Sequence, residues 1–247
     1  MERVPRGLPL TEYLQGRVVV VSPHLDDAVL SLGATIAAAV QQGADVTVLT
    51  VLCGDPFSQT PAGPWDRNSG FASEGEAARV RREEDRRACA ILGAKPRWLP
   101  FADEQYDRHG DEQEITAALR YATTGADMVL VPGWPLVNPD HAWLNTLLLG
   151  ARTEGARLGI YVEQPYAFQA PGSALGPAHS WQRLPVRKRD RQLKRKAIEA
   201  YESQLRQLGL GYIGLGRMLA DERSQGGEAL AWVSPAQAQP LLRFGTG

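Results

Sequence analysis

Near its start the chain places a histidine and two adjacent aspartates directly after an apolar run. Residues 18–21 are valines, and His24, Asp26 and Asp27 follow within six residues. A continuous apolar run is typical of a buried parallel strand, and open α/β sheets form their ligand crevice at the carboxyl ends of such strands. Imidazole and carboxylate groups together suit a divalent metal ion, zinc above all. We therefore expect a metal site here; the alternative is that an aspartate only caps the next helix.

A second motif that combines an acid with a histidine follows another apolar run far downstream. Residues 138–141 read Asn-Pro-Asp-His, and the two motifs together hold two of the four histidines of the chain. Asn138 suits the N-cap of a helix and proline suits the first helical position, which would place His141 in the first turn, facing the same crevice. A site of His24, Asp27 and His141 would leave an open coordination position, as catalytic zinc sites do.

Asp26 is the candidate general base of this site. Zinc lowers the pKa of a bound water toward neutrality and polarises a carbonyl oxygen, so a nearby carboxylate is needed to take the proton of that water. Asp26 is adjacent to Asp27 and is expected to point in a different direction. The alternative is that Asp26 caps the helix or contacts a ligand histidine.

Apolar strand patterns alternate with helical patterns along the chain. Strands are predicted at residues 17–22, 45–52, 97–101, 127–131 and 159–163, and helices at 28–42, 74–92, 112–123, 139–155 and 186–208. This βαβα alternation favours an α/β fold with a Rossmann-like, doubly wound, mostly parallel sheet that has helices on both faces. We expect residues 1–247 to form a single domain.

Two long loops interrupt this alternation. They span residues 54–70 and 164–180, and both are rich in proline and glycine. Long loops inside compact domains commonly act as lids or binding segments, so we expect both to frame a pocket at the carboxyl side of the sheet. The alternative is that they are excursions without a functional role.

The composition narrows the class of protein. A chain of 247 residues, 43% of them hydrophobic, fits one large α/β domain or two small ones. A net charge of −1 gives no reason to expect a nucleic-acid partner, and two cysteines cannot form a disulfide framework or a zinc cluster. No signal sequence or membrane span is recognised, so we expect a cytoplasmic enzyme without stable membrane insertion. Whether the chain forms a homo-oligomer is left open.

Basic side chains concentrate toward the C-terminal part of the chain. Residues 183–196 hold eight of them. Such a run could meet a phosphate group or an acidic membrane surface. The alternative is that it forms the solvated face of a helix.

The residues around these motifs resemble one protein family. Residues 23–31, Pro-His-Leu-Asp-Asp-Ala-Val-Leu-Ser, look like the signature of the LmbE-like, or PIG-L, de-N-acetylases. Residues 81–93 and 196–204 are similar to two helices of that family, and residues 138–141 match its second metal motif. The four matches occur in the family's order and extend over most of the chain. Members act on N-acetylglucosaminyl-phosphatidylinositol, on the mycothiol precursor and on N-acetylglucosaminyl groups of antibiotics.

The resemblance implies roles for particular residues. It implies one zinc ion on His24, Asp27 and His141, with Asp26 as the base. It also implies that Arg81 holds the phosphate or polyol part of the substrate and that Asp103, which follows the third strand, contacts the substrate. For Arg81 the alternative is a solvated residue among the other arginines of its helix.

The chain departs from the family at one position of the second motif. Members usually carry a histidine where this chain has Asn138, and that histidine is thought to stabilise the oxyanion or to protonate the leaving amine. Asn138 can donate a hydrogen bond to an oxyanion but cannot supply a proton. Some relatives have a tyrosine at the position of Leu136. The acid for the leaving group is therefore open: Asp26 could carry the proton, or His109 or His179 could supply it.

The resemblance implies a zinc-dependent hydrolase that removes an N-acetyl or other N-acyl group from an amino sugar, such as an N-acetylglucosaminyl glycoside or glycolipid. One alternative is an amidase for another small amide, such as a thiol conjugate. Another is a receiver-type phosphoacceptor domain with magnesium on an acidic pair, which leaves His24 and His141 without a role. The last is a non-catalytic protein that keeps the metal, and turnover of an N-acetylated amino sugar separates it from the enzyme.

Overall fold

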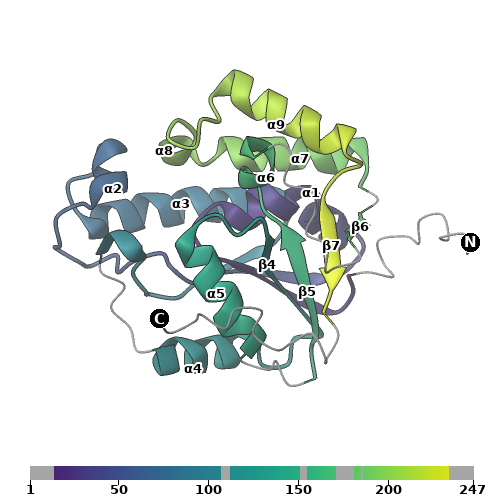
Figure 1. The fold of residues 1–247 in the computed structure, drawn as a ribbon, viewed down its shortest axis with the longest axis horizontal. Helices are drawn as coiled ribbons and strands as arrows, with labels where there is room; N and C mark the ends of the chain where they lie inside the picture. Colours follow the sequence, from purple (N-terminus) through teal and green to yellow (C-terminus); the bar gives the residue numbers. More distant parts are fainter. Residues whose placement is uncertain (1–13, 107–111, 151–154, 171–180, 185, 234–247) are drawn as a thin grey trace, which may run out of the picture.

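The protein is built on one seven-stranded sheet (Figure 1). The computed structural model describes residues 14–106, 112–150, 155–170, 181–184 and 186–233. The strands are β1 (Arg17–Ser22), β2 (Asp45–Thr50), β3 (Lys95–Trp98), β4 (Met128–Trp134), β5 (Arg157–Val162), β6 (Gln182–Arg183) and β7 (Ala229–Trp232). Their order is β3-β2-β1-β4-β5-β7-β6; the first five run parallel, and β7 and β6 pair antiparallel at one edge. The predicted mostly parallel α/β sheet is confirmed.

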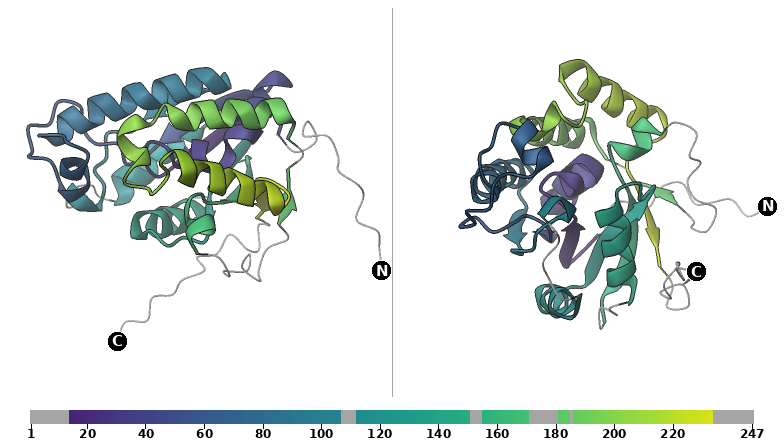
Figure 2. Two further views of the ribbon diagram at one scale, coloured as in Figure 1. Left: turned by 90° about the horizontal axis from the view of Figure 1, so that it is seen from above. Right: turned by 60° about the vertical axis from the view of Figure 1, so that its left-hand side comes forward.

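Helices cover both faces of this sheet. They are α1 (Asp27–Gln41), α2 (Pro64–Asn68), α3 (Glu74–Leu92), α4 (Glu112–Thr123), α5 (Pro139–Gly150), α6 (Tyr166–Gln169), α7 (Lys188–Glu199), α8 (Glu202–Leu205) and α9 (Tyr212–Ser224), with a short 3₁₀ turn, η2, at Glu104–Tyr106. Residues of α1, α3, α7 and α9 share one core, and residues of α4 and α5 belong to the other. Seen from above in Figure 2, α3, α7 and α9 lie side by side over the sheet, with α7 in the middle.

The valines of β1 separate the two cores. Val18 and Val20 face the core beneath α1, whereas Val19 and Val21 face the core above α4 and α5. Successive side chains of a strand point to opposite faces, so a strand covered on both faces must be apolar throughout. Full burial of one valine contributes roughly 1.5–3 kcal/mol, so the run that marks β1 in the sequence is also central to the stability of the sheet.

The strand order places a crevice beside β1. The chain leaves β1 for β2 on one side, and β4 pairs with the other side of β1. In doubly wound sheets, ligands bind where the strand order reverses, at the carboxyl ends of the two strands concerned. His24 follows β1 by two residues and Asn138 follows β4 by four, so both sequence motifs start at this crevice.

Helix α1 is interrupted in its middle. Leu32 has a non-helical backbone conformation (φ −125°, ψ 15°), and the amides of Ala34 and Thr35 donate to the carboxylate of Glu228 at 2.9 and 2.7 Å. A break in a helix frees backbone groups that must find other partners when they are buried. Glu228 in the segment before β7 supplies these partners, so the C-terminal part of the chain fixes the shape of α1.

Lys194 of α7 completes this arrangement from the other side. Its ammonium is fully buried and lies 2.7 Å from a carboxylate oxygen of Glu222 and 2.7 Å from one of Glu228. It also lies 3.5 Å from the carbonyl oxygen of Ser31, next to the break. A Cβ at Gly33 would lie 2.9 Å from Cγ of Lys194, so only glycine lets α7 approach α1 this closely.

The predicted C-terminal helix is wrong in extent. One helix was expected over residues 186–208, but α7 ends at Glu199 and α8 begins at Glu202. Tyr201 between them is fully buried, and its hydroxyl donates to Asp85 at 2.6 Å. The sequence prediction also missed α2, α6, α9, β6 and β7, and it placed the third strand at 97–101 instead of Lys95–Trp98. Residues 151–154, expected to continue α5, lie outside the described part of the chain.

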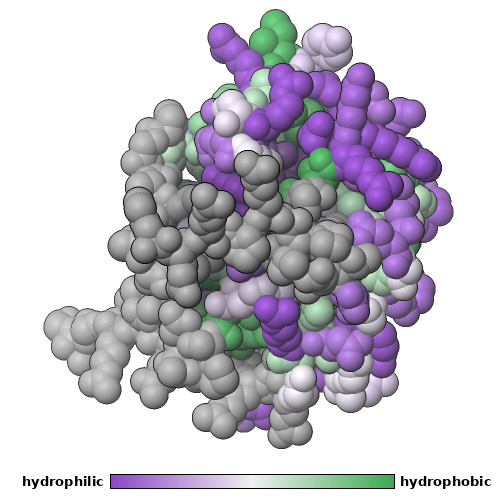
Figure 3. All heavy atoms as spheres, turned by 90° about the vertical axis from the view of Figure 1, so that its right-hand side faces the viewer, coloured by the Kyte–Doolittle hydropathy of each residue, from purple (hydrophilic) through white to green (hydrophobic). Residues whose placement is uncertain are grey.

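The basic run lies mostly on the outside of α7. Arg187, Lys188, Arg189 and Lys196 are exposed, whereas Lys194 is buried in the cluster with two glutamates. Figure 3 shows hydrophilic side chains gathered over the upper part of one face, where α7 and α9 lie. The interpretation as a solvated helix face fits the exposed members and fails for Lys194. None of the described helices is long and apolar enough to cross a bilayer.

Candidate metal centre and active site

Three side chains from the two sequence motifs converge at the crevice. Nδ1 of His24 lies 3.1 Å from Nε2 of His141, and Oδ2 of Asp27 lies 3.2 Å from each of these nitrogens. A tetrahedral zinc ion with bonds of about 2.0–2.1 Å separates its ligand atoms by about 3.3 Å. The triangle of two imidazole nitrogens and one carboxylate oxygen therefore fits zinc, and a fourth position remains for water or substrate.

Local hydrogen bonds hold the first motif in place. The Ser22 hydroxyl donates to the carbonyl oxygen of His24 at 2.6 Å and accepts from the Ala28 amide at 2.9 Å. The His24 amide donates to Oδ2 of Asp27 at 2.8 Å. Asp26 between them has a φ of 146°, a conformation that costs a residue with a side chain about 1–3 kcal/mol. This backbone lets the two adjacent carboxylates diverge, with Asp27 directed to the triangle.

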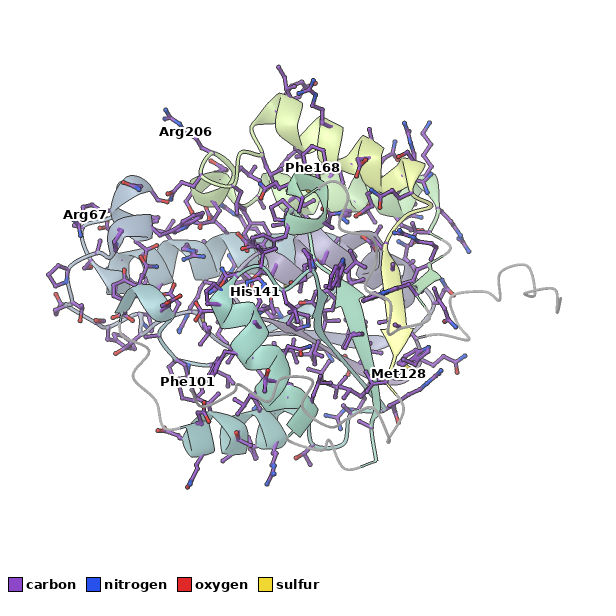
Figure 4. The ribbon with its side chains drawn as sticks, viewed as in Figure 1. Arg67, Phe101, Met128, His141, Phe168 and Arg206 are labelled. Carbon is purple, nitrogen blue, oxygen red and sulfur yellow. The ribbon has the colours of Figure 1, made fainter. Side chains whose placement is uncertain are left out.

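A capped helix holds the second motif. Oδ1 of Asn138 accepts from the Asp140 amide at 2.9 Å, and the carbonyl oxygen of Asn138 accepts from the Ala142 amide at 3.1 Å. Asn138 is thus the N-cap of α5, as predicted, and His141 lies in the first turn. Figure 4 shows His141 at the end of α5 nearest α6, whose Phe168 is also labelled.

Two carboxylates orient the two histidines. Oδ2 of Asp140 lies 3.1 Å from Nε2 of His24, and Oε1 of Glu163 lies 2.5 Å from Nδ1 of His141. The other oxygen of Glu163 accepts from the Leu136 amide at 3.0 Å. Carboxylates in such positions fix the tautomer of a ligating histidine and raise its basicity. Glu163 was not singled out in the sequence, although it ends the predicted strand 159–163.

These neighbours shift the pKa values of the ligands. Burial alone would lower the pKa of His24, but the hydrogen bonds to Asp140 and Asp27 outweigh it and raise this pKa to about 9. Burial would raise the pKa of Asp27, yet the adjacent His141 and His24 hold it well below its usual range. Because a metal ion must displace the proton of an imidazole, metal binding should strengthen as the pH rises.

Asp26 lies beside the triangle and lines the same cavity. Asp26 is buried, with 6% of its surface exposed. It does not belong to the group of three residues whose ligand atoms converge. Burial and the adjacent Asp27 raise its pKa, against the lowering effect of Arg81 and His24. A carboxyl with a raised pKa is a better proton acceptor than an ordinary aspartate.

A cavity of about 270 Å³ is lined by two of the three ligands, His24 and Asp27, together with Asp26. Arg81 and Asp103, the predicted substrate contacts, both line it. So do several residues that the sequence analysis did not single out, among them Trp65, Gln105, Tyr166, Gln204 and Leu208.

Arg81 is a buried residue of this cavity. It is 9% exposed, and its Nη1 lies 3.4 Å from Oδ1 of Asp66, while its Nε has no partner among the described residues. The alternative of a solvated helix residue is therefore wrong. Asp103 accepts from Nε2 of Gln105 at 2.9 Å through one oxygen, and its other oxygen is buried without a partner in the described chain. Both side chains keep polar atoms available for a ligand.

Each of the two predicted loops sends an aromatic residue to the cavity. Trp65 in α2 belongs to the loop 54–70, and its Nε1 donates to Oε1 of Gln204 at 2.8 Å. Tyr166 in α6 belongs to the loop 164–180, and its hydroxyl accepts from Nδ2 of Asn138 at 3.3 Å. Residues 171–180 of the second loop, including His179, lie outside the described residues, as does His109.

The fold and this site agree with one protein family. Residues 19–151 match the family described as PIG-L, GlcNAc-PI de-N-acetylase. The matched range includes His24, Asp26, Asp27 and His141 but ends before Glu163. The chain belongs to this family.

Individual relatives are deacetylases. The chain is 33% identical over 174 residues to 2'-N-acetylparomamine deacetylase of Streptomyces fradiae. This match covers 63% of this chain and 59% of that relative. The chain thus spans about three fifths of that curated relative. The structure of the A40926 pseudoaglycone deacetylase Dbv21 is 31% identical, with a TM-score of 0.72 over 87% of this chain and 96% of that one. The structure of the zinc-inhibited form of teicoplanin deacetylase Orf2 is 27% identical, with a TM-score of 0.75 over 87% of this chain and 97% of that one.

Proposed function

We propose that the protein is a zinc-dependent hydrolase that removes an acetyl group from the nitrogen of an amino sugar, such as an N-acetylglucosaminyl glycoside. One observation carries this proposal: the ligand atoms of His24, Asp27 and His141 converge, and the buried carboxylate of Asp26 lines the same cavity as His24 and Asp27. The deacetylase relatives of similar sequence support the same reaction.

The reaction consumes one water molecule. Its oxygen forms a bond to the amide carbon, the carbon–nitrogen bond breaks, and the products are acetate and an amine. Zinc, held by His24, Asp27 and His141, would lower the pKa of the water and polarise the carbonyl group. Asp26 accepts the proton of the water as it attacks and returns it to the nitrogen as the bond to carbon breaks. This single carboxyl replaces the separate acid that Asn138 cannot provide.

The cavity walls hold the sugar in this proposal. The guanidinium of Arg81 and the free oxygen of Asp103 bind hydroxyl groups, which offer both donors and acceptors. Arg81 already faces Asp66, and Asp26, Asp103 and Glu84 also act on its charge. This surplus of carboxylates favours a polyol over a phosphate as the ligand of Arg81.

Release of a free amine tests the function. The zinc-loaded chain would be incubated with N-acetylglucosamine, its octyl and p-nitrophenyl glycosides and an N-acylcysteine conjugate, and amine and acetate would be measured separately. We expect equal amounts of both from at least one glycoside and none from His141→Ala. Faster release from the cysteine conjugate would favour the amidase alternative. A folded chain with full zinc that releases no amine would favour the non-catalytic one.

The biological setting is a further part of the proposal. We propose a small-molecule substrate, a cytoplasmic location and a possible homo-oligomer, as expected from the sequence. Cell fractionation tests the location, and light scattering of the purified chain tests the oligomeric state.

A further inference from the structure

The amide of Asn138 has a fixed orientation. Its Oδ1 accepts from the Asp140 amide at 2.9 Å, which only an oxygen can do, so the other end of the side chain must be the nitrogen. That nitrogen lies 3.3 Å from the hydroxyl oxygen of Tyr166. An amide nitrogen only donates hydrogen bonds. The hydroxyl of Tyr166 is therefore the acceptor in this contact.

The proton of Tyr166 is consequently free to be donated elsewhere. Tyr166 lines the cavity, and its ring packs edge-on against the ring of His141, with centroids 5.3 Å apart and an angle of 89°. The hydroxyl makes no second hydrogen bond within the described residues. A phenol has an ordinary pKa of about 10, so the hydroxyl keeps its proton at neutral pH. A donor thus faces the space next to a metal ligand.

We propose that Tyr166 is a catalytic residue that donates a hydrogen bond to the carbonyl oxygen of the scissile acetamide, and that Asn138 is the residue that positions it. This inference rests on the proposed deacetylation. No proton is transferred: the O–H···O bond strengthens as the carbonyl oxygen gains negative charge in the tetrahedral intermediate. A hydroxyl that accepts one hydrogen bond donates a stronger one, so the amide of Asn138 increases the effect. Asn138 then acts on the oxyanion through Tyr166, rather than only by direct contact.

Three single variants of the full-length, zinc-loaded chain test this arrangement. Tyr166→Phe removes only the hydroxyl. In Asn138→Asp the side chain still caps α5, but both of its oxygens can only accept hydrogen bonds. The Tyr166 hydroxyl would then donate its hydrogen bond to residue 138 instead of to the substrate. Asn138→Ala leaves the hydroxyl without its partner. Each would be assayed with the p-nitrophenyl glycoside of N-acetylglucosamine, or with the best glycoside found above, at the plateau of its pH profile and with zinc per chain measured.

The expected order of activities is specific to this role. Loss of one oxyanion donor typically lowers kcat about 10²–10³-fold, which we expect for Tyr166→Phe with unchanged zinc and little change in KM. Asn138→Asp should lose nearly as much and Asn138→Ala less. A purely structural cap predicts the reverse order, since aspartate caps helices well and alanine does not. In the Tyr166→Phe background the two Asn138 variants should become equal, because there is no longer a hydroxyl to direct.

A second measurement does not depend on turnover. The methylphosphonamide of glucosamine imitates the tetrahedral intermediate, and its affinity should fall in Tyr166→Phe by about the factor lost in kcat, while glucosamine affinity stays the same. Two results would overturn this inference while leaving the proposed function intact. In the first, the wild-type chain turns over substrate and Tyr166→Phe is equally active. In the second, Asn138→Asp is more active than Asn138→Ala. A wild-type chain that releases no amine would overturn the proposed function and this inference with it.

Discussion

The imidazole of His141 and the carboxylate of Glu163 form a buried pair, with 2.5 Å between Nδ1 and Oε1. The other ring nitrogen of His141 faces the metal triangle, so Glu163 determines which nitrogen carries the proton. Glu163→Gln should weaken zinc binding about 10–100-fold, the usual effect of removing such a partner. Competition with a chelator measures this. Glu112→Gln is the control, because Glu112 also accepts a hydrogen bond from a residue of α5, the indole nitrogen of Trp143, but does so at an exposed position. Equal zinc affinity in both variants would remove Glu163 from the metal centre.

Variants of the two adjacent aspartates, Asp26 and Asp27, should differ in zinc content. Asp27→Asn should lose most of its zinc, because a carboxylate oxygen leaves the triangle. Asp26→Asn should keep zinc, while kcat falls by about two to four orders of magnitude, the usual effect of losing a general base. Metal analysis and steady-state kinetics on the same preparations check both. Near-full activity of Asp26→Asn at saturating zinc would contradict the proposed base.

Trp65 should affect substrate binding rather than catalysis. Its indole lines the cavity and is 36% exposed, and the bond to Gln204 fixes its orientation. Loss of an aromatic contact of about 0.5–1.5 kcal/mol would raise KM roughly 2- to 10-fold in Trp65→Ala with kcat unchanged. Phe57→Ala is the control, since Phe57 lies in the same loop, is exposed and does not line the cavity. The same KM in both variants would exclude Trp65 from recognition.

The buried Lys194 cluster should make stability depend on pH. One lysine faces two glutamates, and Glu228 also accepts two backbone hydrogen bonds, so Glu222 is the group that keeps a proton. Burial, reinforced by Glu228 and opposed by Lys194, raises the pKa of Glu222 from 4.5 to about 7. The folded chain therefore binds this proton more tightly than the unfolded chain. The contribution is complete below about pH 4.5 and disappears as the pH rises through about 7.

Thermal unfolding between pH 4.5 and 8 measures this contribution. In Glu222→Gln the part of the pH dependence that comes from this group should vanish. Glu199→Gln, which removes an exposed ion-pair partner of Arg195 on the same helix, should retain it. Glu228→Ala should destabilise at every pH, by about 1–3 kcal/mol for each of the two amides it leaves unpaired. Identical pH profiles for wild type and Glu222→Gln would contradict the assignment.

Local patterns explain what the sequence predicted correctly. Apolar runs identified β1 and β5, and the ends of parallel strands must meet at one edge, which is why His24 and His141 could be placed together. The missed features depend on contacts between distant segments. Tyr201 ends α7 because its hydroxyl reaches Asp85, and Glu163 gains its role only when β5 lies beside β4. The break at Leu32 likewise requires Glu228, almost two hundred residues away.

The break in α1 bears on how this chain could be divided or recombined. All three candidate ligands lie within residues 19–151, a stretch that could be mistaken for a transplantable catalytic cassette. Yet the helix that follows the first motif takes its shape from side chains of α7, α9 and the segment before β7. A chimera that joined residues 19–151 to the C-terminal part of a relative would have to carry Lys194, Glu222 and Glu228 along with Gly33. Any single crossover between Gly33 and Lys194, including one in the loop before α3, separates Gly33 from the other three residues and is expected to destabilise the chimera unless the relative supplies the same cluster.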